Sequence, residues 1–338
     1  MTNSGKSCCV PARPTEVAAN PVPPSALSEQ TAPAAPRTPK DPPLVVGDAA
    51  PLDLDYVSIP GAATHTGCKI AELPLDGEAP RRPVRVKPFE MAATTVTNSA
   101  FATFVADTGY ATDAEKIGDA AVFSGLLAKP IPHAPTNPDL PWWQLVKGAN
   151  WRHPEGPGSD LVSRDDHPVV HVSHADARAF CAWSGTRLPG EAEWEHAARG
   201  GLEDPRFPWG EEEPTDEKTF CNIWQGAFPH QNSEADGYYG TAPARSFQPN
   251  GYGLYNVMGN VWEWSADAFR VRSAARHARV RNETAAKTDE KLLKGGSFLC
   301  HISYCYRYRI AARHALASNS AASNLGFRVV RQGTRSAE

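Results

Sequence analysis

The stretch GGSFLCHISYCYRYR, residues 295–309, places Cys300 and Cys305 five positions apart among tyrosines and arginines. This spacing suits neither regular element, because residues five apart point to opposite faces of a strand and sit about 140° apart around a helix. The two sulfurs can meet only if the backbone bends, with residues 301–304 forming the bend. From spacing alone, two unrelated buried thiols explain the pattern equally well, since cysteine is among the most buried residue types.

The composition of the chain is that of an ordinary soluble globular protein. Its 338 residues are 41% hydrophobic, enough for a sizeable core in one large domain or two smaller ones. A net charge of -4 without a basic stripe argues against nucleic-acid binding, and no apolar run is long enough to span a membrane. The seven cysteines are an odd number and the N-terminus lacks an apolar signal segment, so we expect a cytoplasmic protein.

The first 50 residues differ from the rest, because they are rich in proline and alanine and poor in aromatic residues. Such a segment buries too little apolar surface to offset its ordering entropy, and we expect it to be disordered. Cys8 and Cys9 lie in this tail. Incidental exposed thiols are a better interpretation of them than a metal site.

Short regular elements are expected from residue 51 onward. Alternating patterns predict strands within residues 55–63 and 82–98, and apolar spacing predicts a helix over residues 99–110. A second helix is predicted in 173–185, with Ser173 as its cap, Asp176 at the capping-box position and Gly185 at its end. A third is predicted in 189–201. Prolines and glycines are dense elsewhere, which indicates an α+β domain dominated by loops.

Two groups of residues suggest metal ligands. His167, His171 and His174 lie close together in sequence, but this spacing alone is weak and a structural role is favoured. The segments 222–240 and 256–264 combine Asn, Asp and Glu with glycine-rich turns, which offer the hard oxygen ligands of calcium. Neither segment matches an EF-hand loop, so polar loops tied by Asx turns are the alternative.

Longer motifs provide a stronger signal. The chain resembles the formylglycine-generating enzymes, the sulfatase-modifying factor family, from about residue 52 to residue 331. The resemblance rests on NIWQGAFP (222–229), APARSFQPNGYGLYNVMGNVWEW (242–264), KGGSFLCHISYCYRYR (294–309) and SNLGFR (323–328), together with KGANWRHPEGP (147–157), DHPVVHVS (166–173) and TRLPGEAEWEHAARGG (186–201).

This resemblance implies a fold and an activity. The fold is a single loop-rich α+β catalytic domain over residues 51–334, related to C-type lectins. The activity is oxidation of the cysteine in a Cys-x-Pro-x-Arg segment of an unfolded or nascent sulfatase to Cα-formylglycine. Dioxygen is the oxidant and a thiol is the reductant. No nucleic-acid or membrane partner is expected, and the protein is expected to be a monomer.

The resemblance also assigns residues. Cys300 and Cys305 correspond to a pair that holds one Cu(I), and soft thiolates do select this ion. Ser297 and Tyr304 correspond to polar catalytic residues beside the copper, whereas Trp262 forms a pocket wall and Asn324 binds the peptide substrate. Two structural calcium sites use side chains and backbone carbonyls. The first maps onto Asn222, Ile223, Asp236 and Tyr238, and the second onto Asn256, Gly259, Val261 and Glu263.

The chain departs from its animal relatives at the disulfide positions. Ile310, Val329 and Ala198 stand where those relatives have cysteines, and Cys181 lacks its partner, so we expect no structural disulfide and a reducing compartment. His174 stands where many relatives have tryptophan.

Two other functions are alternatives to the formylglycine-generating activity. An iron-dependent sulfoxide synthase of the same superfamily would carry a further helical domain with a His-rich site, for which the 50-residue tail leaves no room. A non-catalytic lectin-like binding module would lack one or both active cysteines.

Overall fold

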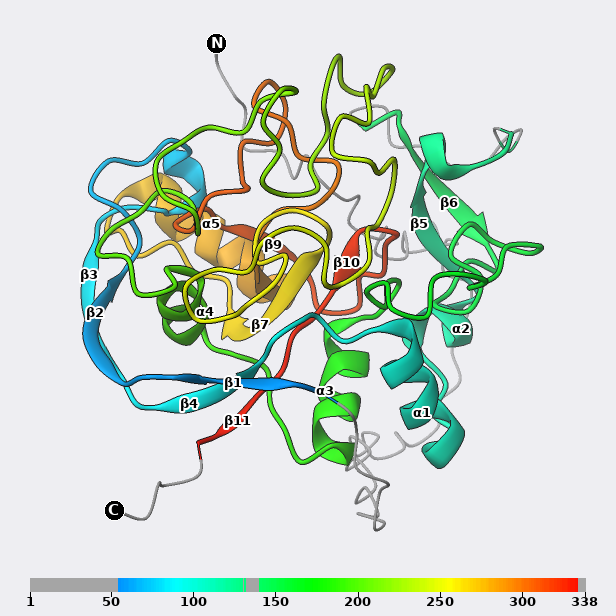
Figure 1. Cartoon of the computed structure of the whole chain (residues 1–338), viewed down its shortest axis with the longest axis horizontal. Coiled ribbons are helices and arrows are strands. Elements are labelled where there is room, and N and C mark those ends of the chain that lie inside the picture. Colours follow the sequence, from blue (N-terminus) through cyan, green and yellow to red (C-terminus); the bar gives the residue numbers. More distant parts are fainter. Residues whose placement is uncertain (1–53, 130, 132–139, 334–338) are drawn as a thin grey trace, which may run out of the picture.

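The computed structural model describes residues 54–129, 131 and 140–333. The tail that was expected to be disordered, including Cys8 and Cys9, lies outside the described residues, as does residue 334. The described part is an α+β fold with short strands, short helices and long loops, as predicted (Figure 1).

A four-stranded sheet carries the cysteine loop. Its order is β10 (Leu325–Gly326), β7 (Trp262–Ala268), β8 (Glu290–Lys294) and β9 (His314–Ala317). β7, β8 and β9 are antiparallel neighbours, whereas β10 lies parallel to β7. The connection from β8 to β9 therefore contains both cysteines of the motif.

A second sheet joins the two ends of the described chain. Its antiparallel strands are β1 (Tyr56–Ile59), β4 (Phe89–Ala92) and β11 (Val330–Gln332), with β4 in the centre. Two further pairs complete the strands. They are β2 (Ala62–Thr66) with β3 (Arg82–Val86), and β5 (Asp119–Phe123) with β6 (Trp143–Lys147).

The three predicted helices are confirmed. They are α1 (Asn98–Thr108), α3 (His174–Trp183) and α4 (Glu191–Ala198). The capping box of α3 forms as expected, because the Asp176 amide donates to the Ser173 hydroxyl at 3.1 Å and the Ser173 amide donates to the Asp176 carboxylate at 2.8 Å. Gly185 follows the helix with a φ of 67°. The short 3-10 turns are Pro74–Asp76 and Ser124–Leu126.

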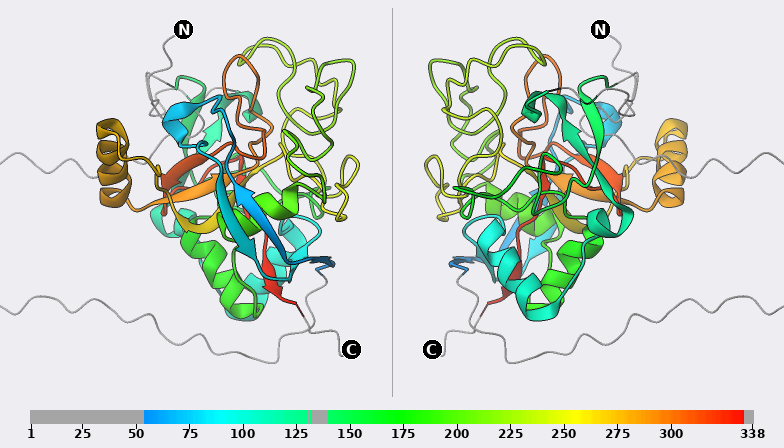
Figure 2. Two further views of the ribbon diagram at one scale, coloured as in Figure 1. Left: turned by 90° about the vertical axis from the view of Figure 1, so that its left-hand side faces the viewer. Right: turned by 90° about the vertical axis from the view of Figure 1, so that its right-hand side faces the viewer.

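Two helices were not anticipated from the sequence. α2 (Asp113–Ile117) is a single capped turn, and α5 (Arg276–Lys287) stands at one edge of the molecule (Figure 2). Only Ala278 and Ala285 of α5 are buried, so the apolar stripe that normally reveals a helix is almost missing from its sequence.

Buried tryptophans and buried ion pairs hold the long loops together. The main core runs from Ile59 to Val330 and includes six fully buried tryptophans, at positions 143, 151, 194, 224, 262 and 264. Charged side chains also form ion pairs in the interior, such as Arg309 with Glu78 and Lys294 with Glu195. The first pair joins two loops that no strand ladder positions, and the second joins β8 to α4. Losing one partner of either pair would leave a buried charge.

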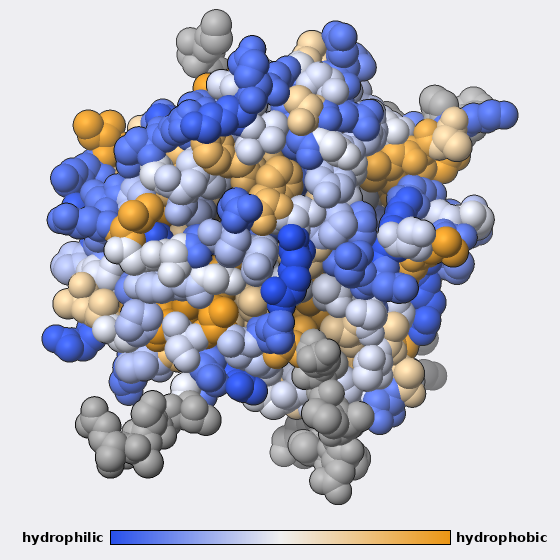
Figure 3. All heavy atoms as spheres, in the orientation of Figure 1, coloured by the Kyte–Doolittle hydropathy of each residue, from blue (hydrophilic) through white to orange (hydrophobic). Residues whose placement is uncertain are grey.

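The surface alternates between apolar and polar residues. Figure 3 shows separate hydrophobic patches between hydrophilic side chains on one face. None of the helices in the described ranges is long and apolar enough to cross a membrane.

Candidate active site

The two cysteines of the opening motif meet in the structure. Their Sγ atoms are 3.0 Å apart, which exceeds the about 2.05 Å of a disulfide bond. The chain bends between them as predicted, because the amides of Tyr304 and Cys305 both donate to the His301 carbonyl, at 3.0 and 2.8 Å. Both cysteines are only 1% exposed. The interpretation as two unrelated core thiols is therefore wrong.

A glycine lets the loop close over the first sulfur. Gly296 has a φ of 77°, and a Cβ there would lie 3.3 Å from Cys300 Sγ and 3.1 Å from Tyr308 Cα. A side chain at this position would be strained and would crowd the sulfur. Gly296, the second glycine of the motif, is thus a requirement of the site geometry.

Hydrogen-bond donors surround the two sulfurs. The Ser297 amide donates to Cys300 Sγ at 3.4 Å, and the Arg307 guanidinium donates to Cys305 Sγ at 3.8 Å. Donors and positive charge beside a thiol favour the thiolate, which is the form that binds metals and reacts.

Burial dominates the environment of the other described thiols. Burial raises the pKa of Cys68 to about 11 and that of Cys181 to about 12, and it raises the pKa of Cys221 well above its ordinary value. No disulfide joins cysteines within residues 54–333 as far as the structure describes them. These three residues are protonated structural thiols at neutral pH.

Ser297 and Asn324 lie together next to the cysteines. The Asn324 amide donates to the Ser297 hydroxyl at 2.9 Å, and Asn324 is fully buried. Its Oδ1 atom has no hydrogen-bond partner, so the same side chain also carries an unsatisfied buried acceptor. Trp262 is held to the same segment, because its amide donates to the Asn324 carbonyl at 2.9 Å. Its ring is fully buried and packs 5.1 Å from that of His314.

Tyr304 belongs to an aromatic cluster that sequence reasoning missed. Its ring stacks on Phe228 at a centroid distance of 4.1 Å and meets Trp142 edge-on at 4.9 Å. All three rings are half-buried. They come from segments far apart in sequence, so no local pattern could have indicated the cluster.

The first expected calcium segment folds around Asp236. Its carboxylate accepts hydrogen bonds from the Ile223 and Tyr238 amides, at 3.2 and 3.0 Å, which brings the four expected residues together. Asn222 is buried and its Oδ1 atom has no hydrogen-bond partner. A buried amide oxygen without a partner and the carboxylate of Asp236, which binds the next residue along the chain, are the oxygen ligands that a hard cation uses.

The second expected calcium segment contacts the first. The Asn260 amide donates to the Asn222 carbonyl at 2.8 Å, and the neighbouring Gly259 has no room for a side chain beside that same carbonyl. Asn256 also has a buried Oδ1 atom without a partner.

Glu263, however, already has strong partners. Its carboxylate accepts from the Arg328 guanidinium at 3.0 Å and from the Trp194 indole at 2.8 Å, and Arg328 is fully buried. A cation at the second segment would share this carboxylate with Arg328.

The histidine trio does not converge. His167 bonds Thr241, His171 bonds the Pro154 carbonyl and His174 bonds the Ser265 carbonyl. Burial lowers the pKa of His174 to about 4, so this ring is neutral at physiological pH. Across the described residues, no group of three or more His, Cys, Asp or Glu side chains is arranged to hold a metal ion.

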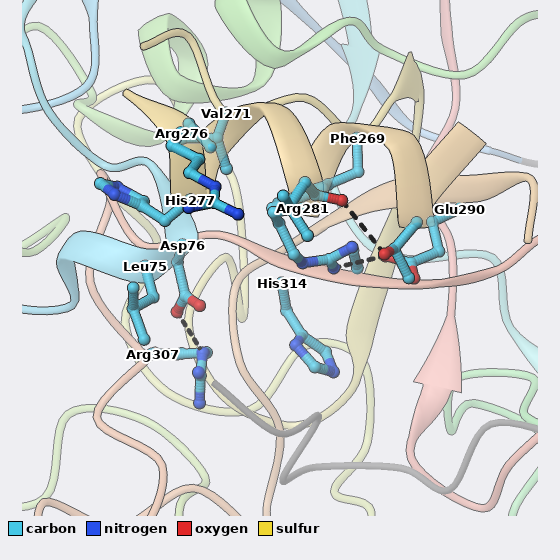
Figure 4. A pocket seen from close by; sticks show the side chains of 14 residues that line it. Leu75, Asp76, Phe269, Val271, Arg276, His277, Arg281, Glu290, Arg307 and His314 are labelled. Atoms are coloured by element: carbon cyan, nitrogen blue, oxygen red, sulfur yellow. Dashed lines mark hydrogen bonds and ion pairs between the residues drawn. The ribbon is translucent and has the colours of Figure 1, made fainter. Parts of the chain in front are cut away.

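A large cavity lies beside the cysteine loop, beneath α5. It measures about 780 Å³ and is lined by Arg307 and His314 on one side and by Arg276 and Arg281 of α5 on the other (Figure 4). Arg307 bonds Asp76 at 2.7 Å at its edge. The cysteines do not line this cavity, but Arg307 lines it and also donates to Cys305 Sγ.

Comparisons with known proteins point to one enzyme family. Residues 46–333 match the family described as "Sulfatase-modifying factor enzyme 1-like domain". The formylglycine-generating enzyme of Thermomonospora curvata is 50% identical over 281 residues, which cover 80% of this chain and 91% of that protein. The formylglycine-generating enzyme of Bos taurus is 46% identical over 274 residues, which cover 80% of this chain and 73% of that protein.

Two more distant matches limit what similarity shows. "Inactive C-alpha-formylglycine-generating enzyme 2" of Bos taurus is 41% identical and covers 73% of this chain and 77% of its own length. The solved structure of PvdO from Pseudomonas aeruginosa has a TM-score of 0.54 at 23% identity, covering 82% of this chain and 94% of that one. The PvdO match shows a shared fold alone. The Bos taurus match shows that sequence similarity extends to a protein named inactive.

Proposed function

This chain belongs to the sulfatase-modifying factor family, and we propose that it oxidises the cysteine of a Cys-x-Pro-x-Arg segment in sulfatases to Cα-formylglycine. Dioxygen serves as the oxidant and a thiol as the reductant. The substrate is an unfolded or nascent sulfatase, because a folded core would hide the segment.

One observation carries the proposal beyond family membership, since a protein named inactive is also similar to this chain. Cys300 and Cys305 converge to 3.0 Å in a buried site, beside donors that favour thiolates. A binding module has no need of such a pair, whereas an oxidase that works through a thiol-bound metal requires it.

The donor set suits Cu(I). Two thiolates are soft ligands that select this ion over hard cations, and Cys300 and Cys305 would hold it. When bound, Cu(I) supplies a redox-active centre at which dioxygen is activated.

The surrounding residues position the substrate and protect the site. Burial of the sulfurs excludes water from the reactive thiols, and the positive charge of Arg307 lies beside Cys305 Sγ, to which it donates at 3.8 Å. The free acceptor of Asn324 suits a backbone N–H group of a bound peptide, because a buried carbonyl without a donor is costly. The half-buried ring of Tyr304 offers an apolar face beside the cysteines for the proline of the motif.

Calcium has a structural place in the proposal. The first segment, around Asn222 and Asp236, has the stronger support because the Asp236 carboxylate accepts hydrogen bonds from backbone amides and Gln225, whereas Glu263 of the second segment is paired with Arg328. At the second segment, Glu263 would bind calcium while remaining paired with Arg328. We further propose a monomer in the cytoplasm, where the thiols described above stay reduced.

The direct test is conversion of a peptide. The full chain is incubated with Cu(I), dioxygen, a thiol and a Cys-x-Pro-x-Arg peptide, and the product aldehyde is identified by mass spectrometry. Cys300→Ser and Cys305→Ser should each abolish turnover, because a protonated hydroxyl cannot replace a thiolate on a soft cation.

Cys181→Ser is the matched control, because Cys181 is equally buried but belongs to helix α3. This variant should keep its activity. Equal activity of the Cys305→Ser variant and the control would contradict the proposal.

A further inference from the structure

The chain contains the substrate motif of its own proposed activity. Residues 9–13 read Cys-Val-Pro-Ala-Arg, a complete Cys-x-Pro-x-Arg segment. None of the other six cysteines in the sequence is followed by proline two positions later. The segment lies before residue 46, where the family match begins, and so stands outside the matched domain.

We propose that this enzyme modifies itself, with Cys9 of each chain converted to formylglycine at the Cys300–Cys305 site of the same chain. The proposal rests on the proposed function. It assigns a role to the tail and to one of its two cysteines, and it makes the tail a competitor of external substrates until Cys9 has been converted.

The site offers recognition elements for such a segment. Asn324 is fully buried, is linked to Ser297 at 2.9 Å and has an unsatisfied Oδ1 acceptor. Ser297 in turn donates its amide to Cys300 Sγ at 3.4 Å. An extended peptide with its cysteine at the sulfur pair could donate a backbone N–H to Asn324, which would remove a buried unsatisfied group.

The proline of the segment also has a suitable surface. Pro11 stands two residues after Cys9, which is about 7 Å along an extended chain. Tyr304, adjacent to Cys305, and Phe228 form a stacked aromatic pair at 4.1 Å, with Trp142 edge-on to Tyr304. Aromatic rings of this kind are the usual surface for proline in peptide recognition. Ile302, which stands two residues before Tyr304 in the bend, is 55% exposed and is a second apolar side chain of the same loop.

The tail is long enough to reach the site. Forty residues separate Arg13 from Leu54, the first described residue. A chain of that length spans up to about 130 Å when extended, whereas a domain of this size has a radius of gyration of only about 19 Å. An attached substrate is also present at an effective concentration on the order of 1 mM. Reaction within one chain is therefore favoured over reaction between chains.

The chemistry is the proposed one and balances without further reactants. The Cys9 side chain (CH₂SH), one O₂ and two thiol molecules give the aldehyde (CHO), H₂S, one disulfide and one H₂O. The Cβ–S bond and one Cβ–H bond of Cys9 break, and a carbon–oxygen double bond forms. O₂ accepts four electrons, two from the Cys9 Cβ and two from the thiols.

The test uses the full chain. Reduced protein is loaded with copper and incubated with O₂ and a thiol, then digested with trypsin. Because Pro14 follows Arg13, the relevant fragment runs from residue 7 to residue 37. Conversion appears as loss of one sulfur and two hydrogens and gain of one oxygen, and fragmentation assigns it to Cys9 or Cys8.

Variants show which residues the conversion of Cys9 requires. Cys8→Ser should still be converted at Cys9, whereas Pro11→Ala should slow conversion at least tenfold without lowering turnover of an external peptide. Cys305→Ser should leave Cys9 as a thiol. The first-order rate should not change on tenfold dilution of the protein, and the Cys9→Ser variant should show a lower apparent KM for external peptide than unconverted wild type.

The outcomes separate this inference from the proposed function. If external peptide is converted while Cys9 remains a thiol, self-modification is overturned and the proposed function stands. If neither is converted, both fail. Aldehyde at Cys9 in Cys305→Ser protein would show that another enzyme made it, and a rate that falls in proportion to dilution would overturn reaction within one chain.

Discussion

Replacing Glu263 by glutamine should destabilise the fold strongly, whether or not calcium is present. Arg328 is fully buried and donates to Glu263 and to the carbonyls of Ala92, Ala93 and Tyr255. The change removes the only negative charge among these partners, and an uncompensated buried charge costs about 3–5 kcal/mol. For a domain of this size, that corresponds to a fall in Tm of roughly 10 °C.

The assay is thermal and urea unfolding with calcium and with a chelator. Glu212→Gln is the control, because it breaks an exposed pair with Lys218 and should change the free energy of unfolding by less than about 1 kcal/mol. A Glu263→Gln loss confined to calcium-containing buffer would refute the reasoning, since it would make calcium rather than Arg328 the main partner of this carboxylate.

Three further predictions concern calcium, pH and the tail. A chelator should lower the Tm of the wild-type protein, because calcium bound only to the native state stabilises it, and Asn222→Ala should largely remove that difference; equal melting curves with and without chelator would eliminate both calcium sites. Lowering the pH from 7 to 5 should cost the fold about 2 kcal/mol through His174, because the unfolded ring binds a proton near pH 6.5 while burial holds the native pKa near 4. His174→Trp should flatten this part of the pH dependence measured by urea unfolding, and an unchanged slope would contradict it. Removing residues 1–50 should preserve or raise turnover of an external peptide, and a large loss would mean that the tail supports catalysis.

The predictable parts of the fold are those with local chemistry. Ser173 and Asp176 predict the start of α3, because a capping box is formed by two residues that are three apart in sequence. α5 escaped prediction because only two alanines face the interior, so tertiary contacts rather than amphipathic periodicity place it. Long loops were expected, but the ion pairs that hold them, such as Arg309 with Glu78, join residues 231 positions apart.

The candidate site also has features that could be predicted from the sequence and features that could not. The spacing of Cys300 and Cys305 left two interpretations open, and only the bend at His301 shows that the sulfurs converge. The cluster of Tyr304 with Trp142 and Phe228 could not be predicted, because each ring comes from a separate loop or strand end and none carries a motif of its own. The roles expected for the site residues come from the motif resemblance. The structure shows which side chains lie next to them.

The most direct test of the central claim is X-ray absorption spectroscopy of the Cu(I)-loaded full chain, with and without a Cys-x-Pro-x-Arg peptide under anaerobic conditions. Cys300 and Cys305 should provide two sulfur ligands to one copper ion per chain, and the substrate cysteine should add a third. The Cys300→Ser and Cys305→Ser variants should each lose stoichiometric copper. A copper site without sulfur ligands, or a sulfur count that the cysteine peptide leaves unchanged, would contradict the account.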